Sequence, residues 1–188
     1  MRIVLLTIVL MFLFQICTAP VFDFEGKIFK ILSLLESADK RHHELELSRF
    51  IKDLGYRESE NNWLCVNRIG CFGEWQFAES TLRILGFKKI TLKRFRANPG
   101  IFPREMQLEA LKELIKINLN YLRNYEHYIG DTIKGVVITK SGMLAASHLG
   151  GAGTLIEFLD SNGKINRKDI FGTSIYDYVK KFSAYELE

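Results

Sequence analysis

One carboxylic acid in this chain stands a fixed distance before a turn marked by glycines. Glu58 is followed by Ser59 and then by Gly70, Gly73 and Gln76 in the order G-x-x-G-x-x-Q. A carboxylic acid that keeps its proton near neutral pH can act as a general acid, and an apolar, partly closed pocket favours that state. We expect nearby aromatic side chains to form the wall of such a pocket: Trp63, Phe72, Trp75 and Phe77. The predicted chemistry is proton donation by Glu58.

The order and spacing of these residues resemble the active-site signature of lytic transglycosylases in the lysozyme-like superfamily. A second block, SGMLAASHLGGAGTLIEFL at residues 141–159, looks like the helix-turn segment, often written A-Y-N-x-G, that closes the sugar cleft in those enzymes. The ending FGTSIYDYVKKF also resembles that of some bacterial members. The resemblance covers residues 45–185 and implies a mainly α, lysozyme-like (α+β) domain with a substrate cleft.

The resemblance implies that Glu58 is the catalytic acid and that the substrate is the glycan strand of peptidoglycan. It implies neither a metal nor an organic cofactor. The other residues expected to contact substrate or shape its site are Ser59, Gly73, Trp75, Gln76, Phe77 and His148. One departure from the pattern is that Ser147-His148 stands where the family has an aromatic residue and an asparagine. Tyr121, Tyr125 or Tyr128 would have to replace that aromatic residue.

Most glycosidases use a second carboxylate as nucleophile or base. The candidates by sequence are Glu60, Glu74 and Glu79, and each is expected to be a solvated charge. With Glu58 alone, the acceptor would be the primary hydroxyl of muramic acid, which yields a 1,6-anhydro product. Three alternatives stay open: a hydrolytic muramidase, a cell-wall-binding protein without turnover, and a membrane-anchored part of a secretion or conjugation apparatus.

The amino-terminal residues have the layout of a secretory signal peptide, with Arg2 before the apolar run 3–14. We expect residues 1–19 to be a signal peptide or an amino-terminal anchor, and residues 20–188 to form the transglycosylase domain in the periplasm or cell envelope. An uncleaved leader would associate the domain with a membrane. A lipoprotein site at Cys17 is disfavoured because Ile16 is not small. The remaining length suits one domain.

The net charge of +4 suits an anionic envelope polymer but does not demand one. The basic residues at 88–96 belong to no nucleic-acid-binding motif, so a solvated face is favoured and no nucleic-acid partner is expected. Cys65 and Cys71 would form a disulfide in an oxidising compartment or remain small buried groups. The stretch 160–169 has the order of the latter part of a calcium loop, but Phe158 stands where the first ligand should be, so no metal is expected.

Apolar periodicity predicts helices over residues 26–36 and 43–54, the second delivering Glu58 at or just beyond its end. Its apolar residues are expected to pack inward: Leu45, Leu47, Phe50, Ile51 and Leu54. Further along the chain we expect a short helix at 79–85, an irregular stretch at 91–103, the longest helix from Pro103, a short strand or link at 134–139, and two helices separated by the glycines at 150–153, the first capped by Ser141.

Overall fold

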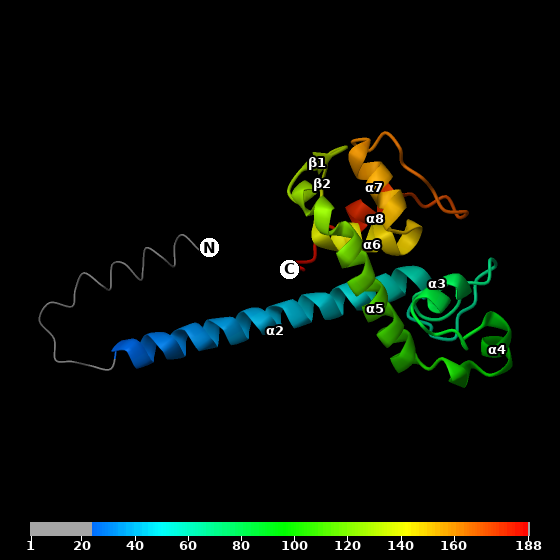
Figure 1. Ribbon diagram of the computed structural model, residues 1–188, viewed down its shortest axis with the longest axis horizontal. Coiled ribbons are helices and arrows are strands. Elements are labelled where there is room, and N and C mark those ends of the chain that lie inside the picture. Colours follow the sequence, from blue (N-terminus) through cyan, green and yellow to red (C-terminus); the bar gives the residue numbers. More distant parts are fainter. Residues whose placement is uncertain (1–23, 188) are drawn as a thin grey trace, which may run out of the picture. The chain divides into compact units, whose positions relative to one another are not determined.

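The computed structural model describes residues 24–187 and has a mainly helical fold, as the sequence predicts (Figure 1). The leader expected at residues 1–19 lies outside the described part. The chain divides into two compact units, one ending at His42 and the other spanning His43–Glu188. Within the described residues, no helix combines the length and the apolar character that crossing a membrane requires.

Helix α2, Phe24–Ser59, is one continuous helix where the sequence predicted two. No glycine or proline occurs between Lys27 and Leu54, so nothing in that stretch ends the helix. In the first unit its large apolar side chains are exposed: Phe29, Ile31, Leu32, Leu34 and Leu35.

In the second unit Phe50 and Leu54 of α2 are buried, and Leu47 and Ile51 pack against the core. The prediction was wrong for Leu45, which is 65% exposed.

The middle of the chain is more helical than expected. Helix α3, Glu79–Ile84, agrees with the prediction, whereas the stretch expected to be irregular contains helix α4, Leu92–Ala97, and the 3-10 turn η1, Pro99–Ile101. Helix α5, Arg104–Leu122, follows Pro103 and is shorter than α2, so it is not the longest helix. A second 3-10 segment, η2 (Arg123–Tyr128), follows it, and β1 (Thr132–Ile133) then pairs antiparallel with β2 (Val136–Val137).

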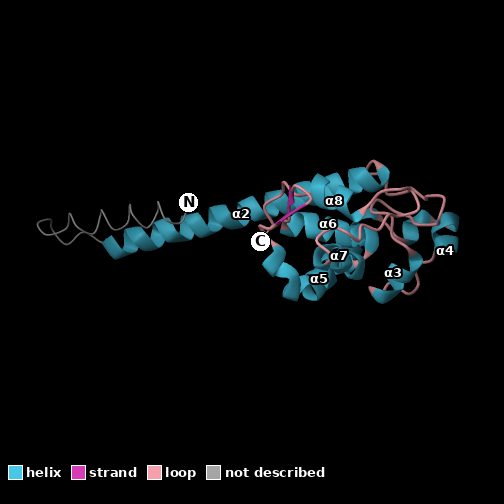
Figure 2. Cartoon of the chain, turned by 90° about the horizontal axis from the view of Figure 1, so that it is seen from above, coloured by secondary structure: helices cyan, strands magenta, loops and turns pink. Residues whose placement is uncertain are grey.

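Helix α6, Lys140–Gly150, is the centre of the second unit, because all its residues from Ser141 to Ser147 are buried. It packs against α5, α7 (Ala152–Asp160) and α8 (Ile175–Lys181), as Figure 2 shows from above. Thr139, not Ser141, caps α6: its hydroxyl accepts a hydrogen bond from the Gly142 amide. The predicted break between α6 and α7 is confirmed at Gly151, where φ is +80°.

A phenylalanine cluster supports the segment that follows Glu58. Isolated bridges join Phe72 to Val66 and to Phe77, which fold residues 65–77 into a tight hairpin-like loop. Beneath it the Phe72 ring lies 4.8 Å from that of Phe95, and the Phe102 ring lies 6.1 Å from those of Phe72 and Phe77. These rings are almost fully buried, so the loop has a rigid base.

Candidate functional site

Glu58 is the penultimate residue of α2, which confirms its predicted position at a helix end. Its side chain is 15% exposed. After Ser59 the backbone leaves the helix through Glu60 and Asn61, which both adopt positive φ. The Asn61 amide donates to the Gly55 carbonyl and closes the last turn. Glu58 is therefore held by a helix on one side and a sharp turn on the other.

Tyr178, on α8, holds the Glu58 carboxylate directly. Its hydroxyl donates a hydrogen bond to Glu58 Oε1 over 2.5 Å. Burial raises the pKa of the Tyr178 phenol, and the Glu58 carboxylate raises it further, so the phenol stays protonated as a donor. The Arg57 guanidinium lies 5.7 Å from the centre of the same ring. Tyr178 thus fixes one of the two carboxylate oxygens of Glu58.

His148, near the end of α6, is the second side chain that lies close to Glu58 Oε1. Its side chain is 9% exposed, and its Nε2 lies 4.0 Å from Glu58 Oε1. The same Nε2 lies 2.9 Å from the Trp75 carbonyl oxygen, which can only accept a hydrogen bond, so the ring donates from Nε2. Nδ1 is buried and has no hydrogen-bond partner among the described residues. The imidazole therefore joins the end of α6 to the backbone of the glycine-marked turn.

These side chains share one cleft of about 530 Å³, a volume in the range of small-molecule sites. Two loops complete its lining, one at 67–71 and one at 169–173, together with Gln76 and Leu149. Of the six residues that the sequence marked in addition to Glu58, two, Gln76 and His148, line this cleft with it.

Gln76 has a backbone φ of +49°, and its amide nitrogen donates to the Gly73 carbonyl oxygen over 2.7 Å. Its Oε1 is buried and has no hydrogen-bond partner within the described part of the chain. The side chain of Gln76 thus braces the turn that carries it and also lines the cleft.

The other marked residues lie outside the cleft lining. Trp75 is fully buried and donates from its indole to the Ile51 carbonyl, and Phe77 is buried beside His148. The Ser59 hydroxyl donates to the Glu74 carbonyl over 2.7 Å. The cleft wall is not built by the four aromatic residues that the sequence suggested. Its large apolar side chains are Ile69, Leu149, Ile170, Phe171 and Tyr178.

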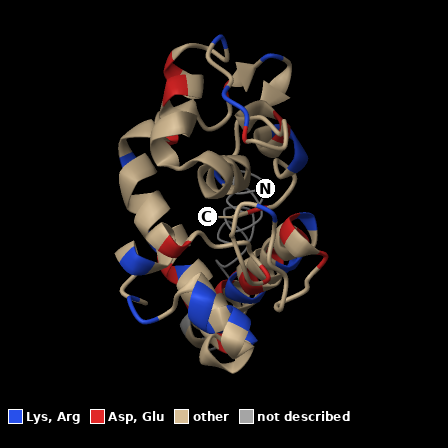
Figure 3. Ribbon diagram, turned by 90° about the vertical axis from the view of Figure 1, so that its right-hand side faces the viewer, with Lys and Arg blue, Asp and Glu red and all other residues tan. Residues whose placement is uncertain are grey.

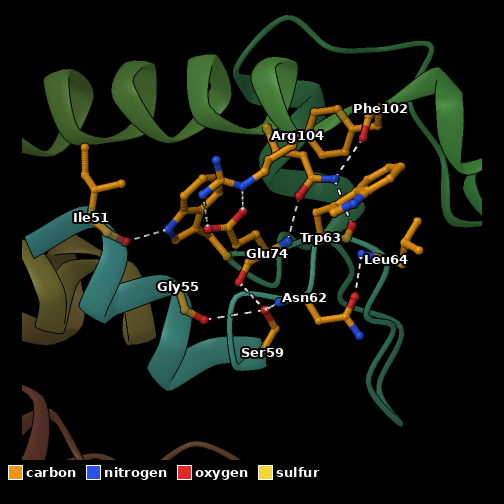
Figure 4. A network of polar contacts seen from close by, with 11 residues as sticks. Ile51, Gly55, Ser59, Asn62, Trp63, Leu64, Glu74, Phe102 and Arg104 are labelled. Atoms are coloured by element: carbon orange, nitrogen blue, oxygen red, sulfur yellow. Dashed lines mark hydrogen bonds and ion pairs between the residues drawn. The ribbon is translucent and has the colours of Figure 1, made fainter. Parts of the chain in front are cut away.

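Glu74 is fully buried, so the prediction of a solvated charge was wrong for this residue. Arg104 donates to both carboxylate oxygens, over 2.5 and 2.9 Å (Figure 4). The Glu74 amide donates to Gln107 Oε1, while the Gln107 amide group donates to the Trp63 and Phe102 carbonyls. This network ties the glycine-marked turn to α5, which explains why a carboxylate is buried there.

Two glycines make this close packing feasible. A Cβ atom at Gly73 would lie 2.6 Å from Gln107 Oε1, and Gly73 has a φ of +87°. A Cβ atom at Gly55 would lie 2.7 Å from Asn61 Oδ1 and 3.1 Å from Glu74 Oε1. Gly73 therefore serves the approach of the turn to Gln107, since it does not line the cleft.

The two loops that line the cleft have the same construction. In the first, Asn67 Oδ1 accepts from the amides of residues 69 and 71, and the Asn67 amide donates to the carbonyl of residue 71. In the second, Asp169 Oδ1 accepts from the amides of residues 171 and 173, and the Asp169 amide donates to the carbonyl of residue 173. Each has a glycine with positive φ three residues after the bracing side chain. We name them the Asn67 turn and the Asp169 turn.

Cys65 and Cys71 are free thiols. Burial raises the pKa of the Cys71 thiol, a hydrogen bond with Asn67 opposes that shift, and the charge of Glu58 adds to it. A thiol with a raised pKa is mostly neutral and a weak nucleophile, so Cys71 lines the cleft as an uncharged side chain. Within residues 24–187 no cluster of three or more His, Cys, Asp or Glu side chains is arranged to hold a metal ion.

The basic residues of segment 88–96 are exposed: Lys88, Lys89, Lys93, Arg94 and Arg96. Figure 3 shows that Lys and Arg positions occur on several sides of the ribbon and are interspersed with Asp and Glu positions.

The sequence of the chain matches no protein-family model, and no curated protein or solved structure matches it.

Proposed function

We propose that the chain is a lytic transglycosylase that cleaves peptidoglycan glycan strands between N-acetylmuramic acid and N-acetylglucosamine, with a lysozyme-like fold. The observation that carries this proposal is the placement of Glu58, a largely buried carboxyl group at a helix end, in a cleft of about 530 Å³. The sequence signature around Glu58 supplies the choice of substrate. The proposed setting is the cell envelope.

The proposed mechanism gives the two oxygens of Glu58 different tasks. The described contacts of the carboxylate, with Tyr178 and His148, all involve Oε1, so Oε2 is the oxygen that presents the proton. Protonated Glu58 donates to the glycosidic oxygen as the bond to the muramic acid breaks. The resulting carboxylate accepts the proton of the muramic acid primary hydroxyl, whose oxygen bonds to the anomeric carbon and closes the 1,6-anhydro ring. Glu58 ends the cycle protonated, as it began.

The test is the nearly isosteric substitution Glu58→Gln, because an amide cannot donate this proton. General acid catalysis supplies about a hundred- to ten-thousand-fold in rate, so we expect a loss of that size with the fold intact. Glu60→Gln is the matched control, since Glu60 is an exposed glutamate just past the helix end and outside the cleft. Purified peptidoglycan is the substrate, and circular dichroism reports on folding. A folded Glu58→Gln protein that keeps a tenth of the parent rate would exclude Glu58 as the acid.

A hydrolytic muramidase is the second candidate, and one observation favours it. Asp169 lines the cleft and is a second carboxylate that the sequence did not mark. Its Oδ1 accepts backbone hydrogen bonds from Phe171 and Thr173, over 2.9 and 2.8 Å, so its first task is to brace the turn. If Asp169 also activated water, the products would carry a reducing end.

Asp169→Asn separates the two candidates, because asparagine keeps the bracing oxygen and loses the charge. We expect this variant to retain activity within about tenfold and to release anhydro products, which weigh one water less than hydrolysis products. A base in a glycosidase contributes about a hundredfold or more. A loss of that size, together with reducing products from the parent enzyme, would move the assignment to a muramidase.

A further inference from the structure

The tips of the Asn67 turn and the Asp169 turn touch each other beside the cleft that both line. The Arg68 guanidinium lies 4.6 Å from the centre of the Phe171 ring, in a cation–π arrangement. Arg68 Nη2 also points to the Ile170 carbonyl oxygen, 3.5 Å away. A third link, from Arg57 Nη2 to Thr173 Oγ1 over 3.1 Å, fastens the Asp169 turn to the end of α2.

Both turns present their tips from a backbone that is braced by several hydrogen bonds. Each is closed by two backbone amides on one side-chain oxygen and by further backbone hydrogen bonds across its base. The Asp169 turn is closed below by the Lys168–Ser174 bridge, and Ser174 then begins α8 through a reciprocal capping box with Asp177. The tips are thus presented by ordered backbone on both sides.

A long glycan strand cut at an internal bond by Glu58 would have to leave the cleft on both sides of that bond. Asn67, Ile69 and Cys71 line the cleft from one turn, and Asp169, Ile170, Phe171 and Thr173 line it from the other. Where Arg68 meets Phe171 these two linings are joined, so the cleft has a continuous wall there.

We propose that the Arg68–Phe171 contact closes one end of the cleft and makes the enzyme cut glycan strands from their ends, releasing one short fragment at a time. This inference rests on the proposed function and specifies which strands that site accepts. Arg68 and Phe171 then determine specificity without touching the reacting atoms.

The experiment compares the full chain with Arg68→Ala, Phe171→Ala and the double variant on long, uniform, end-labelled glycan strands. Product lengths are measured when about a tenth of the bonds are cut, which is early enough to separate end-wise from internal cleavage. Arg83→Ala is the matched control, because Arg83 is an exposed arginine on α3 that pairs with Glu79 away from the cleft. Phe171→Trp tests rescue, since indole is the better ring for a cation.

We expect the parent, Arg83→Ala and Phe171→Trp to release short fragments while the remaining strands stay long. Loss of the contact should raise the share of internal cuts by about two- to fivefold, the range expected for an exposed cation–π contact. Internal cutting by the active parent would overturn this inference and leave the proposed function standing, as would unchanged products from the double variant. A folded parent that cuts no glycan strand at all would overturn both.

Discussion

Removing the Arg104 side chain should destabilise the second unit strongly, although Arg104 itself is 54% exposed. The reason lies in its partner, because the Glu74 side chain has no exposed surface and both its oxygens accept from Arg104. Leaving one partner of a buried pair uncompensated costs about 3–5 kcal/mol. Water can enter where the half-exposed guanidinium was, so we expect Arg104→Ala to fall at the lower end, about 3 kcal/mol.

Thermal unfolding of the full chain measures this effect. For a domain of this size, 1 kcal/mol shifts Tm by roughly 2–4 °C, so Arg104→Ala should lower Tm by about 6–12 °C. Lys116→Ala is the control: Lys116 is an exposed cation that lies 3.9 Å from the exposed Glu113, and its loss should cost less than about 0.5 kcal/mol.

The double variant with Glu74→Gln identifies the cause. If the unpaired carboxylate is what destabilises Arg104→Ala, replacing it by a neutral amide should restore about 1 kcal/mol or more. A Tm for Arg104→Ala within 2 °C of the parent would refute the argument that this buried pair holds the turn on α5. A double variant less stable than Arg104→Ala would show instead that the arginine acts through its packing.

Two further outcomes are expected. Tyr178→Phe removes the donor to Glu58, and a hydrogen bond to a charged group contributes about 1.5–3 kcal/mol. We therefore expect kcat to fall by roughly ten- to a hundredfold with little change in KM, whereas Tyr176→Phe on the same helix should leave both unchanged. Burial, together with a hydrogen bond to Asp53, raises the pKa of Tyr185 to about 12 from 10.0. The folded state thus holds this proton more tightly, so the stabilisation is complete below pH 10 and is lost as pH rises towards 12. Thermal scans at increasing pH should show the Tm gap between the parent and Tyr185→Phe narrowing over that interval, and a constant gap would contradict the linkage.

The sequence predicted best where a local signal acts alone. The predicted glycine break is found at Gly151, which separates α6 from α7 with a positive φ, because glycine adopts that conformation at low cost. The sequence did not predict α4. Only Phe95 of its six residues is buried, so no apolar periodicity marks this helix. Apolar periodicity predicted two helices where α2 is one, because the polar residues near position 40 carry no apolar period, although that stretch contains no helix breaker.

For the candidate site, the position of Glu58 at a helix end was predictable, whereas its partners were not. Tyr178 meets Glu58 across 120 residues of sequence, and only the packing of α8 brings them together. The burial of Glu74 likewise depends on Arg104, a residue 30 positions away on another helix. The pattern N-x-x-G, repeated as D-x-x-G at residues 169–172, was the one local signal that would have revealed the paired turns.

In the Asn67 turn and the Asp169 turn, different residues determine the backbone shape and the side chains presented beside the cleft. In each turn one Asn or Asp side chain and one glycine fix the backbone, while the two residues between them brace the turn only through a backbone amide, at residue 69 or 171, and not through their side chains. Arg68 and Ile69 in one turn, and Ile170 and Phe171 in the other, are therefore replaceable without redesigning the loops that carry them. Varying these four positions would therefore change the side chains beside this cleft on a fixed backbone, which makes the two turns a compact target for a combinatorial library that tests which ligands the cleft accepts.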